Sequence, residues 1–320
     1  FMPKVLVTGG GGYIGSTLVR MLLAKGHSVR VLDRFFFGRE SLQDVENLVE
    51  IVQDDVRWVD HSILDGIDVV IDMAALSNDP AGELDQSKTL EINHIGRVRM
   101  ATLGKKKGVK RYILASSCSV YGFQDELLDE NSTTNPLTTY ARANLLWEAD
   151  VLPLADATFC VTALRQATVY GLSHRMRFDL AINGMILGFF KNGKIPILRD
   201  GDQWRPMIHV KDTCKAFITV MEAEPALVNR QIFNVGANEQ NYKIFPLARL
   251  EDLDIKNNDL LINATPACLK ETDSLPINDE FLHKRAQWNF LIVPKQRRTQ
   301  HVCLGERSVK GQLQCLSPSF

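Results

Sequence analysis

The sequence predicts an α/β protein built on a doubly wound parallel sheet, followed by a smaller C-terminal lobe. Two observations lead to this fold class. Over residues 1–165, short apolar runs alternate with segments of helical length, and a glycine-rich turn follows the first of these runs. Alternation of this kind is typical of a parallel sheet that carries helices on both faces.

The first strands and helix follow directly from the residue pattern. Lys4–Thr8 is an apolar, β-branched run that predicts the first strand, and residues 14–25 form an amphipathic helix that ends at Gly26. Apolar runs at 28–32 and 50–53 predict the second and third strands.

The pattern continues with three further strands. Apolar runs at 68–72, 111–115 and 159–164 predict strands four to six, and helical segments lie between them at about 87–107 and at 140–155. With a right-handed crossover at each step, the six strands form one doubly wound sheet.

The pattern changes after Arg165, so we expect a first domain at 1–165 and a smaller lobe at 166–320. The tail after about residue 250 has weak periodicity and stays unassigned. The elements expected in the lobe are a helix at 175–192, a strand-like run at 195–198, a polar turn at 200–206, a helix at 209–222 and a strand at 232–235.

The composition excludes several classes of protein. The 320 residues are 45% hydrophobic and 23% charged, with a net charge of −1, so neither nucleic acid nor an anionic membrane is expected as the main partner. No apolar stretch approaches the roughly 18 residues of a membrane span, and we expect no signal peptide. The six cysteines show no metal-ligand spacing, which predicts free thiols, no metal site and a cytoplasmic protein.

The glycine-rich turn after the first strand predicts a dinucleotide site. Gly9 permits the tight turn, Gly12 lets the backbone approach a pyrophosphate, and Gly15 allows the helix to pack closely on the strand. The amides of the first helical residues, Tyr13 and Ile14, would then face the phosphates.

The residue at the end of the second strand predicts which dinucleotide binds. Asp33 lies 18 residues after Gly15 and is placed to accept hydrogen bonds from both ribose hydroxyls. Its negative charge would repel a 2′-phosphate, so NAD is the expected cofactor. Arg34 beside it leaves NADP as the alternative.

Three more segments make the pattern specific. Residues 70–75 (VIDMAA), 116–122 (SSCSVYG) and 136–140 (PLTTY) resemble signature segments of the extended short-chain dehydrogenase/reductase family, and the resemblance covers about residues 4–245. Within that family the chain is most similar to nucleotide-sugar epimerases and dehydratases. The resemblance implies a Rossmann domain, NAD as cofactor, a nucleotide-sugar substrate, transient oxidation of a sugar hydroxyl with return of the hydride, and a homodimer formed through helices 88–107 and 140–155.

The resemblance also implies roles for individual residues. Ser117 would bind the reacting hydroxyl, Tyr140 would act as the general acid/base, and Asn93 would kink the fourth helix. Besides the glycine turn and Asp33, the cofactor-binding residues would be Asp55 and Val56 at the adenine, Ala74 and Ala75 beside the nicotinamide, and Tyr140. The substrate-binding residues would be Ser77, Ser117, Thr168 and Arg205.

The chain departs from the family at one catalytic position. The family's motif is Tyr-x-x-x-Lys, but here Asn144 follows Tyr140 at that spacing. A phenol with a pKa near 10 is a poor base unless that pKa is lowered, and Asn144 cannot supply the positive charge that lowers it. Asn144 shares the helix face of Tyr140 and can keep a ribose hydrogen bond as a weakened catalytic partner, whereas Arg142 points elsewhere.

Other positions separate the activities within the family. A 4,6-dehydratase would carry Asp-Glu where this chain has Cys118 and Ser119, so we rank epimerisation above dehydration. Cys118 has no histidine partner in the motif and is interpreted as a packing residue. Two alternatives stay open: a non-catalytic NAD- or sugar-nucleotide-binding protein that lost the lysine, and a ketoreductase that uses exchangeable NAD(P)H. The sugar, the nucleotide and the reacting carbon are not specified by the sequence.

Overall fold

The computed structural model describes residues 2–124, 128–196, 205–236, 305–307 and 313–315. The chain divides into two compact units. The first comprises Phe1–Met176 and Ile208–Gly236, and the second comprises Arg177–Met207 and Ala237–Phe320.

The first unit is built on a parallel sheet that has seven strands among the described residues. In spatial order the strands are β3 (Glu50–Gln53), β2 (Ser28–Asp33), β1 (Lys4–Thr8), β4 (Val69–Asp72), β5 (Arg111–Ser117), β6 (Cys160–Gln166) and β9 (Gln231–Val235). The chain order reverses at β1, because β2 lies on one side of it and β4 on the other. This order confirms the doubly wound α/β fold predicted from the sequence.

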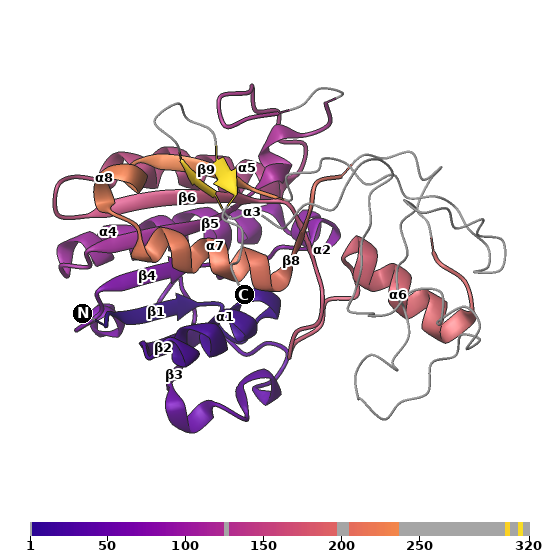
Figure 1. Cartoon of the computed structure of the whole chain (residues 1–320), viewed down its shortest axis with the longest axis horizontal. Coiled ribbons are helices and arrows are strands. Elements are labelled where there is room, and N and C mark those ends of the chain that lie inside the picture. The colour runs from indigo at the N-terminus through magenta and orange to yellow at the C-terminus, as the bar shows by residue number, and fades with distance from the viewer. Residues whose placement is uncertain (1, 125–127, 197–204, 237–304, 308–312, 316–320) are drawn as a thin grey trace. The chain divides into compact units, whose positions relative to one another are not determined.

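Helices cover both faces of this sheet (Figure 1). On one face α1 (Tyr13–Ala24) packs against α7 (Val210–Glu222), and on the other α4 (Arg97–Lys106) packs against α5 (Thr139–Val151). The core beneath α4 and α5 takes alternate strand residues, among them Leu6, Val70, Tyr112 and Leu114. Their neighbours Val5, Val7 and Ile71 are also fully buried, as expected for a sheet that is covered on both sides.

The expected helix at 87–107 is divided into three parts. These are α3 (Gln86–Leu90), a π-helical turn η4 (Glu91–Gly96) and α4. The fully buried Asn93 lies in this turn, where its Oδ1 accepts a hydrogen bond from the Leu76 amide and its Nδ2 donates one to the Leu76 carbonyl oxygen. The turn therefore ties the helix to the segment that follows β4.

The unit boundaries differ from the boundary expected at residue 165. The strand expected in the C-terminal lobe is β9, and it pairs in parallel with β6 at the edge of the main sheet. α7 begins one residue after the expected start, with His209 as its N-cap, and packs on α1. Residues 208–236 thus complete the first unit, because β6 offers an unpaired edge that a later strand can extend.

The second unit contains α6 (Ala181–Asn192), which is shorter than the helix expected at 175–192. Arg177 pairs with Asp179 at 2.5 Å, and the Asn183 amide donates to the Arg177 carbonyl oxygen at 3.0 Å. Such local bonds compete with helical ones, which explains the later start. Most of the turn expected at 200–206 and half of the run at 195–198 lie outside the described residues.

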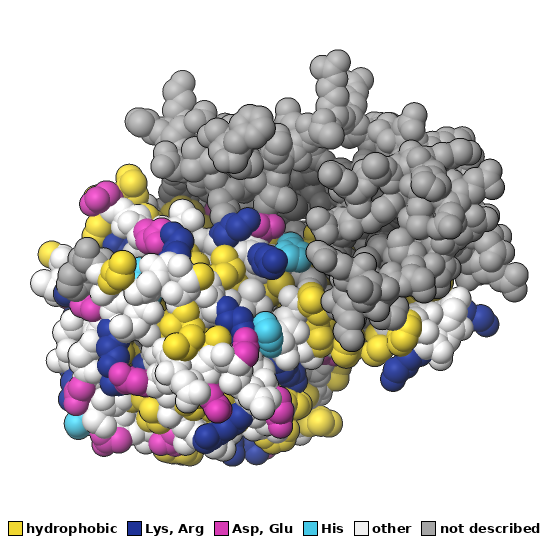
Figure 2. Space-filling view, turned by 60° about the horizontal axis from the view of Figure 1, so that its bottom comes forward, with side chains coloured by type: hydrophobic (Ala, Val, Ile, Leu, Met, Phe, Trp, Pro, Cys, Tyr) yellow, Lys and Arg dark blue, Asp and Glu magenta, His cyan; other side chains and the backbone are white. Residues whose placement is uncertain are grey.

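The remaining short elements complete the described chain. They are α2 (Asp79–Leu84), α8 (Pro225–Val228), the pair β7 (Thr168–Tyr170) and β8 (Met207–His209), and the antiparallel pair β10 (Gly305–Arg307) and β11 (Leu313–Cys315). None of the helices in the described ranges is long and apolar enough to cross a bilayer. Acidic and basic side chains are interspersed over the face shown in Figure 2, which agrees with the net charge of −1.

Candidate cofactor and active site

The glycine turn lies between β1 and α1, at the edge where the strand order reverses. Gly9 adopts a left-handed conformation with φ of +70°, which favours glycine. The Gly12 amide donates to the Gly9 carbonyl oxygen at 3.0 Å and closes the turn. A Cβ on Gly15 would collide with that same oxygen, so the close packing of α1 on the turn requires glycine there.

The N-terminus of α1 has the features of an anion site. Its N-cap is Gly12, no side chain among the described residues caps it, and its first turn carries no acidic residue. The first amides of a helix and its dipole attract negative charge. A dinucleotide pyrophosphate fits this cradle, because glycine backbone replaces the side chains that would fill it.

A buried polar cluster holds the ends of β1 and β4 together at the same edge. The Thr8 hydroxyl donates to Asp72 Oδ1 at 2.5 Å and accepts hydrogen bonds from the amides of Met73 and Ala74, both at 3.0 Å. Ala74 lies so close to the turn that a Cβ on Gly9 would sit 3.1 Å from its Cα. The half-buried segment with Ala74, Ala75 and Ser77 therefore begins directly beside the glycine turn.

Asp33 lies at the end of β2, next to this turn. Its Oδ2 accepts a hydrogen bond from the Gly11 amide at 2.9 Å, and its Oδ1 accepts one from the Phe35 amide at 2.7 Å. Burial raises the pKa of Asp33, and these two amides oppose that shift. Each carboxylate oxygen can accept a further hydrogen bond, so the group can still receive ribose hydroxyls.

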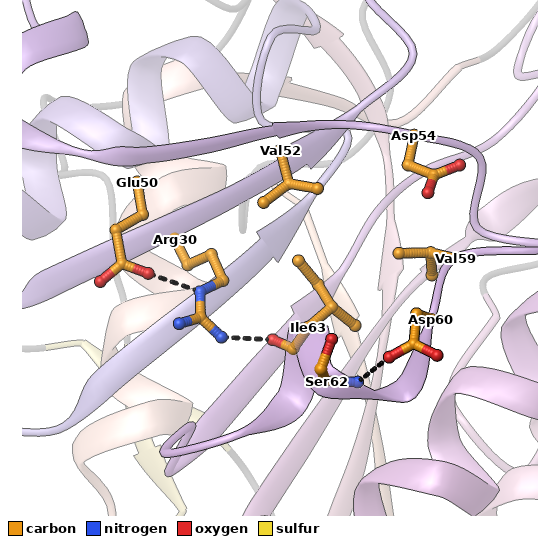
Figure 3. Close-up of a pocket in the computed structure, with 8 residues that line it drawn as sticks. All are labelled: Arg30, Glu50, Val52, Asp54, Val59, Asp60, Ser62 and Ile63. Atoms are coloured by element: carbon orange, nitrogen blue, oxygen red, sulfur yellow. Dashed lines mark hydrogen bonds and ion pairs between the residues drawn. The ribbon is translucent and has the colours of Figure 1, made fainter.

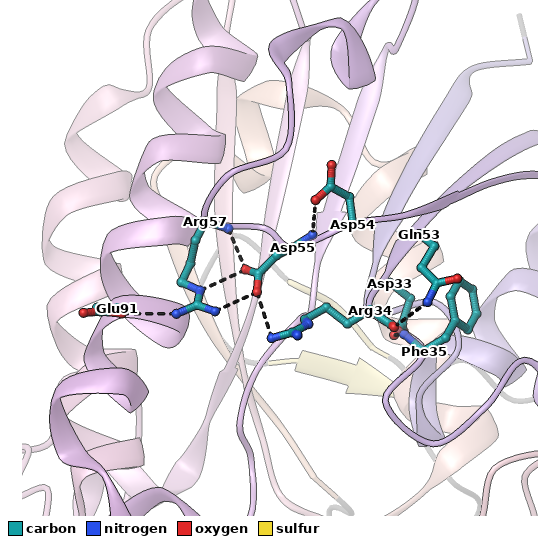
Figure 4. A network of polar contacts seen from close by, with 8 residues as sticks. All are labelled: Asp33, Arg34, Phe35, Gln53, Asp54, Asp55, Arg57 and Glu91. Carbon is teal, nitrogen blue, oxygen red and sulfur yellow. Dashed lines mark hydrogen bonds and ion pairs between the residues drawn. The ribbon is translucent and has the colours of Figure 1, made fainter.

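Asp55 is the centre of a second polar network at this edge (Figure 4). Its carboxylate accepts hydrogen bonds from Arg57 Nε at 3.0 Å and Nη2 at 2.8 Å, and Arg34 Nη1 lies 3.1 Å away. Arg57 also pairs with Glu91 at 3.1 Å. Burial opposes ionisation of Asp55, but the hydrogen bonds from Arg57 outweigh it and hold the pKa of the carboxyl below its usual range. The neighbouring Val56 is buried in the core.

Ser117 and Tyr140 are carried by elements that pack together. Ser117 ends β5 and Tyr140 lies in the first turn of α5, which packs on β5 and on the 3₁₀ turn η5 (Cys118–Tyr121). The Ser117 Oγ accepts a hydrogen bond from the Ser119 amide at 3.1 Å, so its hydroxyl hydrogen can still donate. Burial raises the pKa of the Cys118 thiol to about 12, which agrees with a packing role.

Contacts near its N-terminus and further along its length hold α5, the helix that carries Tyr140, in place. Thr138 caps the helix by accepting a hydrogen bond from the Ala141 amide at 3.2 Å. Further along, Glu148 and Arg165 form a buried ion pair at 2.7 Å that joins α5 to β6. The hydroxyl of Ser116 on β5 also donates to Glu148. These contacts determine where Tyr140 stands relative to the end of β5.

Asn144 is placed differently from what a ribose ligand needs. Its side chain is fully buried, and its Nδ2 donates to the carbonyl oxygen of Tyr140 at 3.1 Å. Its Oδ1 has no hydrogen-bond donor among the described residues. In this arrangement the amide can meet a ribose only if it turns outward, so that role stays a prediction.

The predicted substrate residues fall into different parts of the chain. Thr168 is half-buried at the start of β7 in the first unit, whereas Arg205 is exposed and belongs to the second unit. Within the first unit, the turn, Asp33, the segment after β4 and Ser117 lie at the ends of β1, β2, β4 and β5 on one edge of the sheet, and α5, which packs on β5, carries Tyr140.

Arg97, a fully buried residue at the start of α4, is not among the residues predicted from the sequence. Its Nη2 donates to the carbonyl oxygens of Asp72 and Ala115, at 2.9 and 3.3 Å, which lie near the ends of β4 and β5. One signal could have found it. Arg97 shares the spacing of the apolar stripe formed by Met100, Ala101 and Gly104, and a charge on such a stripe is rarely buried without a role.

A surface hollow of about 320 Å³ lies elsewhere, along β2 and β3 (Figure 3). Arg30 reaches into it but is already bonded to Glu50 at 2.6 Å and to the Ile63 carbonyl oxygen at 2.7 Å. Its lining contains no predicted site residue: Arg30, Glu50, Val52, Asp54, Val59, Asp60, Ser62 and Ile63. The hollow is therefore separate from the candidate site.

Comparisons with known proteins agree on one family. The sequence model of the NAD dependent epimerase/dehydratase family matches residues 5–236. The "Uncharacterized UDP-glucose epimerase YtcB" of Bacillus subtilis (strain 168) is 27% identical over 263 residues, which is 78% of this chain and 82% of that protein.

Similar solved structures cover about three quarters of this chain. MoeE5 in complex with UDP-glucose and NAD is 28% identical with a TM-score of 0.66, over 75% of this chain and 78% of that one. The UDP-glucuronic acid 4-epimerase from Bacillus cereus, in complex with UDP-glucuronic acid and NAD, is 25% identical with a TM-score of 0.69, over 76% and 80%.

Proposed function

Because the chain belongs to the NAD-dependent epimerase/dehydratase family, we propose that it is a nucleotide-sugar epimerase that retains its NAD through the catalytic cycle. The observation that carries this proposal is that the glycine turn, Asp33 and Ser117 lie at the same edge of the parallel sheet, while α5, which packs on β5, carries Tyr140. The relatives named above support a UDP-sugar as the substrate class.

Different residues would bind different parts of the cofactor. The turn at Gly9, Gly12 and Gly15 receives the pyrophosphate, and Asp33 receives the adenosine ribose. The ion pair between Arg34 and Asp55 supports NAD over NADP, because it engages the arginine that would otherwise be available to a 2′-phosphate. When bound, the nicotinamide supplies a reversible hydride acceptor.

The protein's own side chains handle the proton. Ser117 donates a hydrogen bond that orients the sugar hydroxyl, and Tyr140 takes its proton while hydride leaves the same carbon. After the keto intermediate presents its other face, Tyr140 returns the proton as the hydride is returned. The sugar therefore loses one proton and one hydride and regains both, so it undergoes no net oxidation.

One assay distinguishes this proposal from its two rivals. The purified protein is denatured to identify the released nucleotide, and native protein is incubated with UDP-glucose, UDP-glucuronic acid and UDP-N-acetylglucosamine while products and NADH are measured. We expect bound NAD and interconversion of one sugar without net NADH formation. Binding without turnover would favour a non-catalytic binding protein, the alternative suggested by Asn144 in place of the motif lysine. Stoichiometric loss of added NADPH would favour a reductase.

A further inference from the structure

The loop that follows β2 folds back on the glycine turn. Phe35 is buried, and its ring lies so close to Gly11 that a Cβ on that glycine would come within 2.8 Å of it. The Ser41 hydroxyl donates to the Gly11 carbonyl oxygen at 2.8 Å, and the Gly11 amide donates to Asp33 at 2.9 Å. The loop at 33–41 is therefore fixed to the turn on its Gly11 side.

The tip of this loop presents an aromatic ring to solvent. The Gly38 amide donates to the Phe35 carbonyl oxygen at 3.0 Å, so residues 35–38 form a tight turn that has Phe37 near its tip. Gly38 ends this turn in a left-handed conformation with φ of +87°, which favours glycine. The Phe37 side chain is 70% exposed, so the core of the unit does not hold it in place.

A second segment, residues 171–175 between β7 and α6, is fixed to the first turn of α1. The Ser173 hydroxyl donates to the Tyr13 carbonyl oxygen at 2.6 Å and lies 3.0 Å from the hydroxyl of Ser16. The Tyr13 hydroxyl donates to the Gly171 carbonyl oxygen at 2.6 Å. Tyr13 and Ser173 are both buried. This segment belongs to the first unit and is fixed to the glycine turn on its Tyr13 side.

One exposed contact joins the loop and the segment. The guanidinium carbon of Arg175 lies 3.9 Å from the centroid of the Phe37 ring, which is a cation–π contact. Since the loop is bound to Gly11 and the segment to Tyr13, this contact completes a closed circuit of contacts that begins and ends at the glycine turn. The other links of the circuit involve buried side chains, so the circuit opens at the least cost between Phe37 and Arg175.

Both parts of the circuit border the predicted site of the adenosine diphosphate half of NAD. The loop begins at Asp33, which is assigned to the ribose. The 171–175 segment is bound to Tyr13, the first residue of the helix whose N-terminus is assigned to the pyrophosphate. A dinucleotide that occupies both positions has the loop and the segment as neighbours, and a movement of either one changes access to it.

We propose that the contact between Phe37 and Arg175 closes a gate that controls exchange of NAD at the glycine turn. This inference rests on the proposed function, since it takes NAD to be bound there and retained between catalytic cycles. The contact joins two parts of the protein and not protein to cofactor, so it favours closure with and without NAD. Breaking it should therefore raise the rates of NAD binding and release together and leave the dissociation constant nearly unchanged.

The test measures cofactor exchange in the holoprotein and needs no sugar. Protein with bound NAD is mixed with a large excess of isotopically labelled NAD, and mass spectrometry of desalted, denatured samples gives the rate at which the label replaces the original cofactor. We expect Arg175→Ala and Phe37→Ala each to raise this release rate by about fivefold, the upper range for an exposed cation–π contact. Release at the wild-type rate in both variants would overturn the inference.

The dissociation constant separates a gate from a direct ligand of the cofactor. Equilibrium dialysis of the holoprotein against several NAD concentrations gives this constant, and in both variants it should stay within about twofold of the wild-type value. If Arg175 instead bound the dinucleotide, the dissociation constant would rise by as much as the release rate. Such a parallel rise in either variant would mean that the contact is not a gate.

Two further variants test whether the effect belongs to this one contact. The double variant Phe37→Ala with Arg175→Ala should release NAD no faster than the faster single variant, whereas two independent effects would multiply to about 25-fold and would contradict the inference. Leu172→Ala shortens a side chain of the same segment that is 51% exposed, and it should leave the release rate unchanged. Equal acceleration by Leu172→Ala and Arg175→Ala would also overturn the gate.

Turnover assays then distinguish the two proposals. If wild type interconverts no UDP-sugar but NAD release depends on both Phe37 and Arg175, only the epimerase proposal fails. If wild type is active and release depends on neither side chain, only the gate fails. A wild-type protein that binds no NAD would overturn both.

Discussion

At the scale of single residues, the acid/base assignment gives the most direct prediction. Tyr140→Phe removes the phenol oxygen and keeps the ring, so turnover should fall by at least about a hundredfold, as expected for loss of a general acid/base. NAD affinity, measured by fluorescence titration, should change by no more than about twofold, because the turn and Asp33 hold the cofactor. Unchanged turnover would rule out Tyr140 as the acid/base.

Asp33 should determine the choice between the two dinucleotides. Asp33→Ala removes a charged acceptor for the ribose hydroxyls and should weaken NAD binding by roughly 10- to 100-fold, the effect of one charge-assisted hydrogen bond. NADP binding should weaken less, because the repulsion of its 2′-phosphate is also removed. Since Asp33 also accepts from the Gly11 and Phe35 amides, the ratio of the two affinities is the informative measurement. An equal effect on both dinucleotides would contradict the assignment.

Asp55 should make the folded state sensitive to acid. Its pKa is held below the usual range despite burial, because Arg57 donates hydrogen bonds to it. A depressed pKa contributes stability above the unfolded value of about 4, and that stability is lost as the pH falls through the folded value. Urea unfolding from pH 7 down to about 3 should therefore show a weaker pH dependence for Asp55→Asn than for wild type. Parallel curves would show that Asp55 contributes no such linkage.

At the scale of elements, the attachment of α5 to the sheet should depend on one buried ion pair. Glu148→Ala leaves the guanidinium of Arg165 buried without its carboxylate, which costs about 3–5 kcal/mol for pairs of this kind. Chemical denaturation measures the free energy of unfolding. Lys25→Ala, which breaks the exposed pair between Lys25 and Glu222, is the control and should cost no more than about 1 kcal/mol. Similar losses in both variants would contradict the role assigned to Glu148.

Elements with local signals could be predicted from the sequence, and elements set by distant contacts could not. The glycine turn and Asp33 follow from spacing along one strand–turn–helix unit, and the structure places them as expected. The π-helical turn arises because Asn93 binds both backbone groups of Leu76, 17 residues away in the chain. No periodicity within the helix contains that information.

The candidate site shows the same limit. The spacing of Tyr140 and Asn144 identified the missing lysine, but burial of Asn144 and the contact of Arg97 with Trp147 depend on how α4 packs against α5. The sequence shows that residue 97 is an arginine, but it does not show that this arginine is buried. Only the packed structure shows that its guanidinium lies against the Trp147 ring.

At the scale of the whole molecule, we predict a homodimer formed through the helical face that contains η4 and α5. Ile95 on η4 is 60% exposed and Leu146 on α5 is 45% exposed, and the two elements pack together. Size-exclusion chromatography with light scattering should show a dimer, and Ile95→Glu combined with Leu146→Glu should shift it toward the monomer. Leu227→Glu on α8, which replaces a residue that is 62% exposed, should leave the dimer intact. A wild-type monomer at micromolar concentration would contradict this prediction.

The position of β9 has a consequence for biosynthesis. β6 is buried along its whole length, and its last neighbour in the sheet is made of residues 231–235, about 70 residues later in the chain. At a translation rate of about 5–20 residues per second, the ribosome needs roughly 4–14 seconds to make that stretch. During this interval the nascent chain exposes an apolar strand edge, so chaperone capture should be strongest between synthesis of β6 and emergence of β9.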